Sequence, residues 1–227
     1  FISMSAERKP LLESKAAKVL DELAQQPAFQ EVMNPPYIKE IMLPVVEKSL
    51  WTFEHSQGVA KIVGALHEYQ GSPDEVIIRG KRAGLLHDNG KIENPAIPEG
   101  TLDIPGRLSE EAFLGIQTHS RKGFERIKPH DLTVAKLVVA HHEFQGERSY
   151  PRKERRQDTD SFLDEEQAII AVADVVEALF DKRPYKKVWT PGDVCKELEK
   201  KFGDRFNSGF LDHAVAVGEH YMKKGLA

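Results

Sequence analysis

Cysteine is nearly absent from this sequence: Cys195 is the single thiol among 227 residues. One cysteine cannot form an internal disulfide, which excludes disulfide-rich secreted domains and favours a reducing compartment. The sequence also lacks any apolar run near the roughly 20 residues that a membrane-spanning helix needs. The segment Phe1–Met4 is too short and carries too little charge for a signal peptide. We therefore expect a cytoplasmic protein with no membrane partner, whose natural start is Met4 after Phe1–Ser3.

A large excess of charge of either sign is absent as well. The formal net charge is −4, from 32 basic and 36 acidic side chains. No global positive field therefore draws the chain to nucleic acid polymers or anionic membranes. A polyanionic ligand would have to be bound by local basic groups or by metal ions. Hydrophobic residues make up 40% of the chain, as in an ordinary soluble globular protein.

Strand signals are weak throughout, because no run of β-branched residues alternates with polar ones. Helical spacing of apolar residues instead predicts an all-α fold. We expect helices over residues 12–25, 53–70, 132–144, 165–181 and 208–224, with loops over 93–107 and 145–164. Ser72 and Glu75 form a predicted capping box for a helix that ends near His87. Residues 108–111 and Thr190-Pro191 are expected to open further helices.

Two adjacent pairs of residues suggest metal binding. His87-Asp88 closes a predicted helix, and Gly90 lets the backbone turn so that both side chains can converge on one point. His141-His142 is expected within a helix, where neighbouring side chains point about 100° apart and would address a binuclear centre from two sides. Asp174 interrupts an apolar helix face, and a buried carboxylate needs a partner because an unpaired charge is costly there.

Each of these signals is weak when taken alone. A single histidine on an apolar face is usually a core residue, and Asp174 could instead pair with Arg82 or Arg183. The hypothesis of a metal centre rests on the joint occurrence of the residues in order. The candidate ligands are His55, His87, Asp88, His119, His141, His142 and Asp174.

In this order the motifs resemble the HD superfamily of metal-dependent phosphohydrolases, and more narrowly its HD-GYP branch of bacterial cyclic di-GMP phosphodiesterases. The local matches are His87-Asp88-Asn89-Gly90-Lys91 for HDxGK, His119-Ser120-Arg121-Lys122-Gly123 for HxxxG, His141-His142-Glu143 for HHE, Ala171–Ala178 for the aspartate helix, and Arg183-Pro184-Tyr185-Lys186 for RPY(R/K). The sequence departs from the DGxGYP pattern, because Gln145 replaces the aspartate and Ser149 replaces the second glycine, while Tyr150-Pro151 is kept.

The resemblance implies an HD-domain helical bundle over residues 49–227, preceded by a small helical element over 1–48. It places His55, His87, Asp88 and Asp174 around a first metal ion, with Asp88 bridging to a second ion held by His119, His141 and His142. Trp51 stands where some relatives have a glutamate for a third metal, so we expect two divalent ions. Iron or manganese is favoured, and zinc, nickel and cobalt remain open.

The resemblance also assigns roles beyond the metal ligands. It makes Asp88 and Lys91 catalytic, and it places Lys91, Tyr150, Arg183 and Lys186 at the substrate. Glu54 and Glu143 lie next to candidate ligands in the sequence and are candidate acceptors for the second nitrogen of a ligating histidine.

The expected function is hydrolysis of cyclic di-GMP or a related cyclic dinucleotide by a hydroxide that two metal ions activate. The partner would be a phosphorylated small molecule, and a homodimer is left open. Three alternatives also remain: a phosphohydrolase of the same superfamily that acts on another nucleotide, a di-iron oxygenase of the HD type, and a non-catalytic module that senses a ligand.

Overall fold

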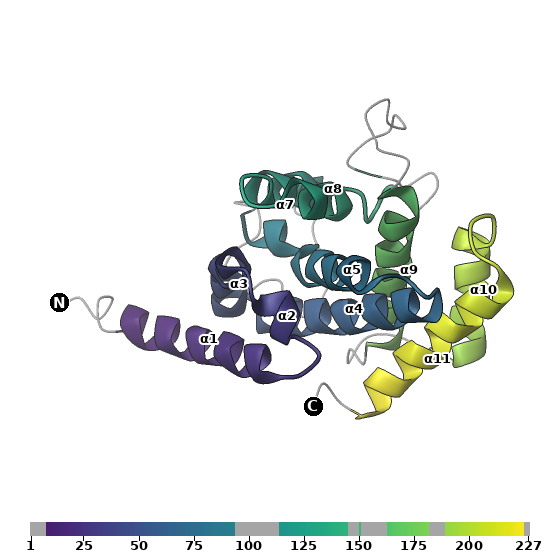
Figure 1. The fold of residues 1–227 in the computed structure, drawn as a ribbon, viewed down its shortest axis with the longest axis horizontal. Coiled ribbons are helices and arrows are strands. Elements are labelled where there is room, and N and C mark those ends of the chain that lie inside the picture. Colours follow the sequence, from purple (N-terminus) through teal and green to yellow (C-terminus); the bar gives the residue numbers. More distant parts are fainter. Residues whose placement is uncertain (1–7, 94–113, 145–149, 151–162, 182–188, 225–227) are drawn as a thin grey trace.

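Every regular element in the described residues is a helix, as the spacing of apolar residues predicts. The computed structural model describes residues 8–93, 114–144, 150, 163–181 and 189–224 (Figure 1). Its helices are α1 (Arg8–Gln25), α2 (Gln30–Met33), α3 (Pro36–Lys48), α4 (Leu50–Tyr69), α5 (Asp74–Leu86), the 3-10 turn η1 (Asn89–Glu93), α7 (His119–Ile127), α8 (Leu132–Val139), α9 (Asp164–Phe180), α10 (Pro191–Phe202) and α11 (Ser208–Lys224). The prediction of an all-α fold is confirmed.

The centre of the fold is α4, which α3, α5, α9 and α11 contact from different sides. Its apolar residues Val59, Ile62, Val63 and Leu66 are fully buried, because a helix surrounded by others can bury more than one stripe. α9 is likewise buried along most of its length. In Figure 1, α1 to α3 lie on one side of this core and α10 with α11 on the other. The two central helices therefore set the frame in which the site residues sit.

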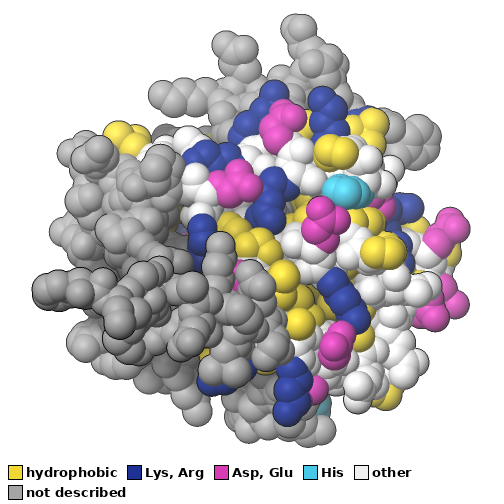
Figure 2. Space-filling model, turned by 90° about the vertical axis from the view of Figure 1, so that its left-hand side faces the viewer, with side chains coloured by type: hydrophobic (Ala, Val, Ile, Leu, Met, Phe, Trp, Pro, Cys, Tyr) yellow, Lys and Arg dark blue, Asp and Glu magenta, His cyan; other side chains and the backbone are white. Residues whose placement is uncertain are grey.

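The face at the α1 end of the molecule carries charges of both signs. Figure 2 shows lysine and arginine side chains interspersed with aspartate and glutamate, with hydrophobic side chains between them, on the described part of this face. Among the described helices, none combines the length and the apolar character that are needed to cross a membrane.

The predicted helix over residues 132–144 is too long, because α8 ends at Val139. His141 and His142 therefore lie in the turn that follows the helix, and the prediction that they lie within it is wrong. The ring of His141 provides the physical reason: its Nδ1 lies 2.6 Å from the carbonyl oxygen of Val138. A continuing helix would use that carbonyl for the backbone N–H of His142, so the side chain competes with the helix.

The predicted capping box of Ser72 and Glu75 is also wrong. α5 begins after Pro73, and no side chain caps its first turn. The hydroxyl oxygen of Ser72 lies instead 3.1 Å from Nδ1 of His67, a residue near the end of α4. The start at Thr190 is confirmed, with a capping box that Asp193 completes. The expected helix start at 108–111 and the loop at 93–107 lie outside the described residues, apart from Glu93, as does most of 145–164.

His67 is a buried histidine outside the candidate site. Its side chain is 1% exposed, and its Nε2 has no hydrogen-bond partner among the described residues. Burial, with Arg79 adding to it, lowers the pKa of His67 to about 4 although Glu165 opposes the shift. The folded protein therefore resists protonation of a group that the unfolded chain protonates readily.

We expect His67 to make the protein less stable in acid. The pKa of His67 is lower in the folded protein than its ordinary value of 6.5. The unfolded chain therefore takes up a proton more readily, so the free energy of unfolding falls as the pH drops from 6.5 toward about 4. The loss between ~pH 7.5 and ~pH 4.5 should be about 2–3 kcal/mol. Urea unfolding of wild type and His67→Gln at both values measures it. If the stability of His67→Gln depended on pH as strongly as that of wild type, His67 would not be the cause of the loss in acid.

Candidate metal centre

The structure brings all seven predicted ligands together from five different segments. His55 lies on α4, His87 and Asp88 follow α5, and His119 is the first residue of α7. The other three come from the turn after α8 and from α9. Six of the seven are buried, and the side chain of His142 is 13% exposed. The ends of three helices and two helix interiors therefore converge on one small volume inside the bundle.

Asp88 lies at the middle of this cluster. Its Oδ2 is 3.4 Å from Nε2 of His87 and 3.6 Å from Nε2 of His55. Its Oδ1 faces the other side, 3.1 Å from Nε2 of His119 and 3.9 Å from Nε2 of His141. The two carboxylate oxygens thus address two different pairs of imidazoles, which is the arrangement that a bridging ligand requires.

Asp174 also reaches both sides of the cluster. Its Oδ1 lies 3.2 Å from Nε2 of His55 and 3.8 Å from Nε2 of His87, and its Oδ2 lies 3.9 Å from Nδ1 of His142. Arg82 donates to the backbone carbonyls of Glu31 and Val32 instead. Asp174 is therefore not part of a core ion pair with Arg82, and Arg183 lies outside the described residues.

Backbone carbonyls orient three of the imidazoles. Nδ1 of His87 lies 2.8 Å from the oxygen of Gly84, and Nδ1 of His119 lies 2.6 Å from that of Ile116. His141 makes the same contact with Val138. A carbonyl oxygen can only accept, so each Nδ1 carries a proton, and in the neutral imidazole each Nε2 then presents a lone pair to the cluster.

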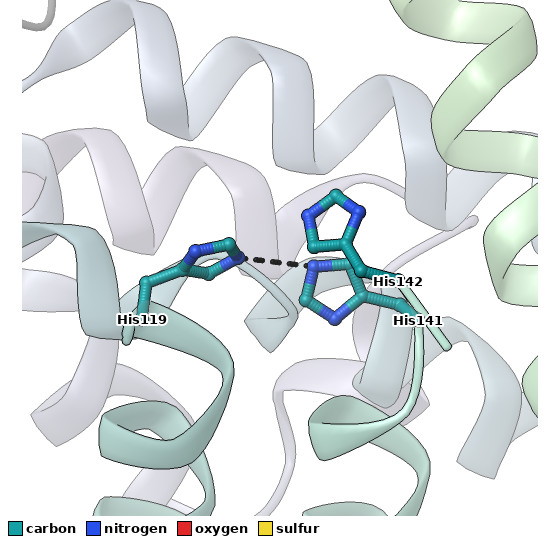
Figure 3. Close-up of side chains that lie close together, drawn as sticks. All are labelled: His119, His141 and His142. Atoms are coloured by element: carbon teal, nitrogen blue, oxygen red, sulfur yellow. Dashed lines mark hydrogen bonds between the residues drawn. The ribbon is translucent and has the colours of Figure 1, made fainter. Parts of the chain in front are cut away.

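The lone pairs of two rings face each other. Figure 3 shows His119 from α7 and the His141-His142 turn pointing toward one another, with Nε2 of His119 3.1 Å from Nε2 of His141. Because both rings carry their proton on Nδ1, neither can donate across this gap. A cation between them would satisfy both lone pairs, as well as Oδ1 of Asp88, which has no hydrogen-bond partner among the described residues.

Burial and neighbouring charges hold His141, His142 and Asp88 in the protonation states that a metal needs. Burial, with the neighbouring histidines adding to it, holds the pKa of His141 well below its usual range. Burial also lowers the pKa of His142 to about 3, although Asp174 opposes the shift. Burial would raise the pKa of Asp88, but His87 and Lys91 outweigh it and hold that pKa well below its usual range. Neutral imidazoles and ionised carboxylates are the forms that bind metals.

Glu177 holds the fourth imidazole and was not anticipated from the sequence. Its carboxylate accepts a hydrogen bond from Nδ1 of His55, so neither Glu54 nor Glu143 takes that position. Burial lowers the pKa of His55, but Glu177 and Asp174 outweigh it and raise that pKa to about 10. Gly58 makes room for this contact, since a Cβ there would lie 2.8 Å from Cγ of Glu177.

The spacing of Asp174 and Glu177 was the only signal in the sequence for this role. Residues three apart on a helix share a face, so the face that carries Asp174 also carries Glu177. That spacing indicates a shared face but not a partner, because His55 lies on another helix.

Lys91 and Trp51 lie beside the cluster. The ammonium of Lys91 forms an ion pair with Oδ2 of Asp88 and lies 5.9 Å from the centre of the Trp51 ring. Trp51 stacks on the ring of His55 at 5.5 Å, and its indole N–H donates to Asp181 at 3.1 Å. An indole, not a carboxylate, therefore borders His55 on this side.

Tyr150, a predicted substrate residue, lies at the cluster. The ring of Tyr150 stacks on His142 at 4.4 Å, and burial together with Asp88 and Asp174 raises the pKa of its hydroxyl. Arg183 and Lys186 lie outside the described residues.

The cluster has the composition of a site for a divalent metal. Three overlapping groups have ligand atoms within 4.8 Å of one another: His55, His87 and Asp88; His119, His141 and His142; and His87, His141 and Asp174. Imidazole and carboxylate ligands suit manganese, iron, cobalt, nickel and zinc alike. The residues present therefore fit a divalent metal ion, and their types are compatible with each of these metals.

Comparison with known proteins places this cluster in a family. Residues 52–179 match the family described as HD domain, a range that holds all seven candidate ligands. The chain is 30% identical over 210 residues to the 3'3'-cGAMP-specific phosphodiesterase 1 of Vibrio cholerae, with 89% of this chain and 46% of that protein covered. It is 32% identical over 162 residues to the cyclic di-GMP phosphodiesterase response regulator RpfG of Xanthomonas campestris, with 68% and 40% covered. The chain thus spans less than half the length of these relatives.

Solved structures share the fold. The HD domain of the phosphodiesterase PgpH from L. monocytogenes, in complex with cyclic-di-AMP, matches with a TM-score of 0.57 and 19% identity, covering 85% of this chain and 98% of that one. Bd1817 from Bdellovibrio bacteriovorus, described as an HDG"Y"P protein, also matches with a TM-score of 0.57, at 16% identity, covering 96% and 75%. The HD fold that the motif order predicts is confirmed.

We expect Glu177→Gln to weaken metal binding. The amide can still accept from His55 but carries no charge, so the imidazole becomes a poorer ligand. Loss of such a supporting contact typically lowers metal affinity about 10–100-fold. Titration of the metal-free protein with Mn²⁺, followed by calorimetry, measures the effect. The exposed Glu125, which lies on α7, supplies the control Glu125→Gln. Equal affinities for the two variants would show that Glu177 does not support the centre.

Proposed function

The chain belongs to the HD domain family, and on that premise we propose that it is a metal-dependent phosphodiesterase of cyclic dinucleotides, with cyclic di-GMP as the favoured substrate. The observation that supports this proposal best is the position of Asp88, whose two oxygens face two different pairs of imidazoles. One carboxylate between two sets of donors is suited to a pair of ions, and paired ions are typical of enzymes that cleave phosphate esters.

The ligand assignment follows the two sides of the cluster. We propose that His55, His87, Asp88 and Asp174 hold one ion and that His119, His141 and His142 hold the other, with Asp88 shared. Iron or manganese is favoured, and zinc, nickel and cobalt are open. When bound, two such ions lower the pKa of a shared water and offset the charge that builds on the phosphoryl oxygens.

The remaining roles belong to side chains around the cluster. Lys91 places an ammonium beside Asp88 with its side chain 15% exposed, where it can bind a phosphate oxygen as a point charge. Tyr150 holds the ring of His142 by stacking and borders the same space. Arg183 and Lys186 are proposed as further phosphate ligands on the basis of the RPY(R/K) resemblance alone.

The substrate class rests on the names of the relatives. The curated relatives named above are phosphodiesterases of 3'3'-cGAMP and of cyclic di-GMP, and the matched PgpH domain was solved with cyclic-di-AMP. All three ligands are cyclic dinucleotides, so we propose that class for this chain. A cytoplasmic location, with a small phosphorylated partner and no nucleic acid polymer, is part of the proposal.

The first experiment is elemental analysis, followed by incubation of manganese- or iron-loaded protein with cyclic di-GMP and chromatography of the products. We expect about two metal ions per chain and a linear guanosine dinucleotide or guanosine monophosphate. Two ions without turnover of cyclic di-GMP, 3'3'-cGAMP or cyclic di-AMP would contradict the proposed substrate. Absence of stoichiometric metal would contradict the centre itself.

We expect Lys91→Met to separate catalysis from metal binding. The change removes the ammonium beside Asp88 but none of the proposed ligands, so metal content should stay at the wild-type level. Loss of one group that stabilises developing charge typically lowers kcat about 10²–10³-fold. Steady-state kinetics with metal analysis of the same samples tests this, with the exposed Lys196→Met on α10 as the control. A wild-type kcat in Lys91→Met would show that Lys91 has no catalytic role.

A further inference from the structure

The 3-10 turn η1 accepts hydrogen bonds from basic residues of two helices, α3 and α7. η1 directly follows His87 and Asp88 and carries Lys91. Lys122 on α7 donates to the carbonyl oxygen of Glu93 at 3.0 Å, and Lys48 on α3 reaches that of Ile92 at 3.5 Å. Neither lysine touches the candidate ligands.

Arg126 on α7 makes the most extensive of these contacts. Its Nη1 donates to the carbonyl oxygen of Asn89 at 3.0 Å and to the side-chain oxygen of Asn89 at 3.3 Å. Its Nε pairs with Glu93 at 3.1 Å, and its Nη2 donates to the carbonyl oxygen of Ile41 on α3 at 3.2 Å. One guanidinium therefore joins α7, both ends of η1 and the N-terminal helical element.

The side chain of Asn89 links Arg126 to the end of α5 and so restrains the neighbouring residue Asp88. Its side-chain nitrogen donates to the carbonyl oxygen of Leu86 at 2.7 Å while its side-chain oxygen accepts from Arg126. The amide is 1% exposed and has both of its ends occupied. It thus connects the end of α5 on one side of Asp88 with Arg126 on the other.

Two glycines bring η1 and α7 into direct contact. A Cβ at Gly90 would lie 2.0 Å from the carbonyl oxygen of His119, and one at Gly123 would lie 2.8 Å from the side-chain nitrogen of Asn89. No side chain fits between the two segments at either point. A shift of η1 would therefore also disturb the first turn of α7, which carries His119.

We propose that Arg126 is a positioning residue of the metal centre, which acts through Asn89 and Glu93 to hold Asp88 and Lys91 in place. The proposal rests on the proposed metal-dependent function. An arginine suits this role because its planar guanidinium stays charged and presents five donors in a fixed geometry. Four acceptors from η1 and α3 lie around Arg126, and a lysine could satisfy them only in part.

The contact with Ile41 extends the support of the centre to the N-terminal element. α3 is itself docked on the turn before α8, where Tyr37 stacks on His130 at 5.2 Å. Its carbonyl at Ile41 then receives a hydrogen bond from the residue that also holds η1. A displacement of α3 would therefore also shift Arg126 and the segment next to Asp88, so α3 helps to position the site.

The test measures metal binding and turnover in Arg126→Ala, Arg126→Lys and the control Arg121→Met, which removes an exposed charge from the same helix. Mn²⁺ affinity comes from titration of the metal-free protein, and kcat and KM come from metal-saturated protein with cyclic di-GMP. We expect Arg126→Ala to lose about 10–100-fold in metal affinity, as supporting residues of metal sites do. Arg126→Lys should lie between Arg126→Ala and wild type, and Arg121→Met should match wild type.

Chemical rescue distinguishes positioning from a general loss of structure. Millimolar guanidinium, far below denaturing concentrations, should restore part of the Mn²⁺ affinity and the kcat of Arg126→Ala, and methylammonium should not. Wild-type Mn²⁺ affinity in Arg126→Ala would overturn the proposal, as would a loss that neither guanidinium nor lysine relieves. If wild-type protein binds Mn²⁺ but does not cleave cyclic di-GMP, the proposed function fails while the affinity measurements still decide the role of Arg126.

Discussion

The structure depends on the burial of two carboxylates among five imidazoles. Asp88 and Asp174 are buried in the bundle, and a buried charge is tolerated only where partners satisfy it. The imidazoles come from α4, from the ends of α5 and α8 and from the start of α7, while Asp174 comes from α9, so each helix has to present its ligand at one point. The packing of the bundle is therefore constrained by the cluster as well as by its apolar core.

Three ligand histidines at helix ends are oriented by the same backbone contact. His87, His119 and His141 each place Nδ1 on the carbonyl oxygen three residues earlier. At Val138 the same contact removes an acceptor that a longer helix would need. Orientation of the ring and termination of the helix thus have one local cause. His55, within α4, instead donates from Nδ1 to Glu177, a buried glutamate of α9.

The N-terminal helices belong to this arrangement through their contacts with η1. α3 reaches the loop after Asp88 through Arg126 and Lys48. The matched region covers 46% and 40% of the two curated relatives, which carry further sequence outside it. In this chain hydrogen bonds connect α3 through Arg126 to Asn89, which is the backbone neighbour of Asp88.

The sequence by itself determined the all-α fold, most helices to within a few residues, the HD family and the seven residues that meet at the centre. Periodicity, motif order and residue type carry that information locally. Only the tertiary structure decided that α8 stops at Val139, that Ser72 turns to His67 and not to its own helix, and that Glu177 supports His55. It also assigned one oxygen of Asp88 to each imidazole pair. The first two depend on side-chain contacts over three and five residues that compete with regular helix structure, and the third joins positions 122 residues apart, which no local pattern encodes.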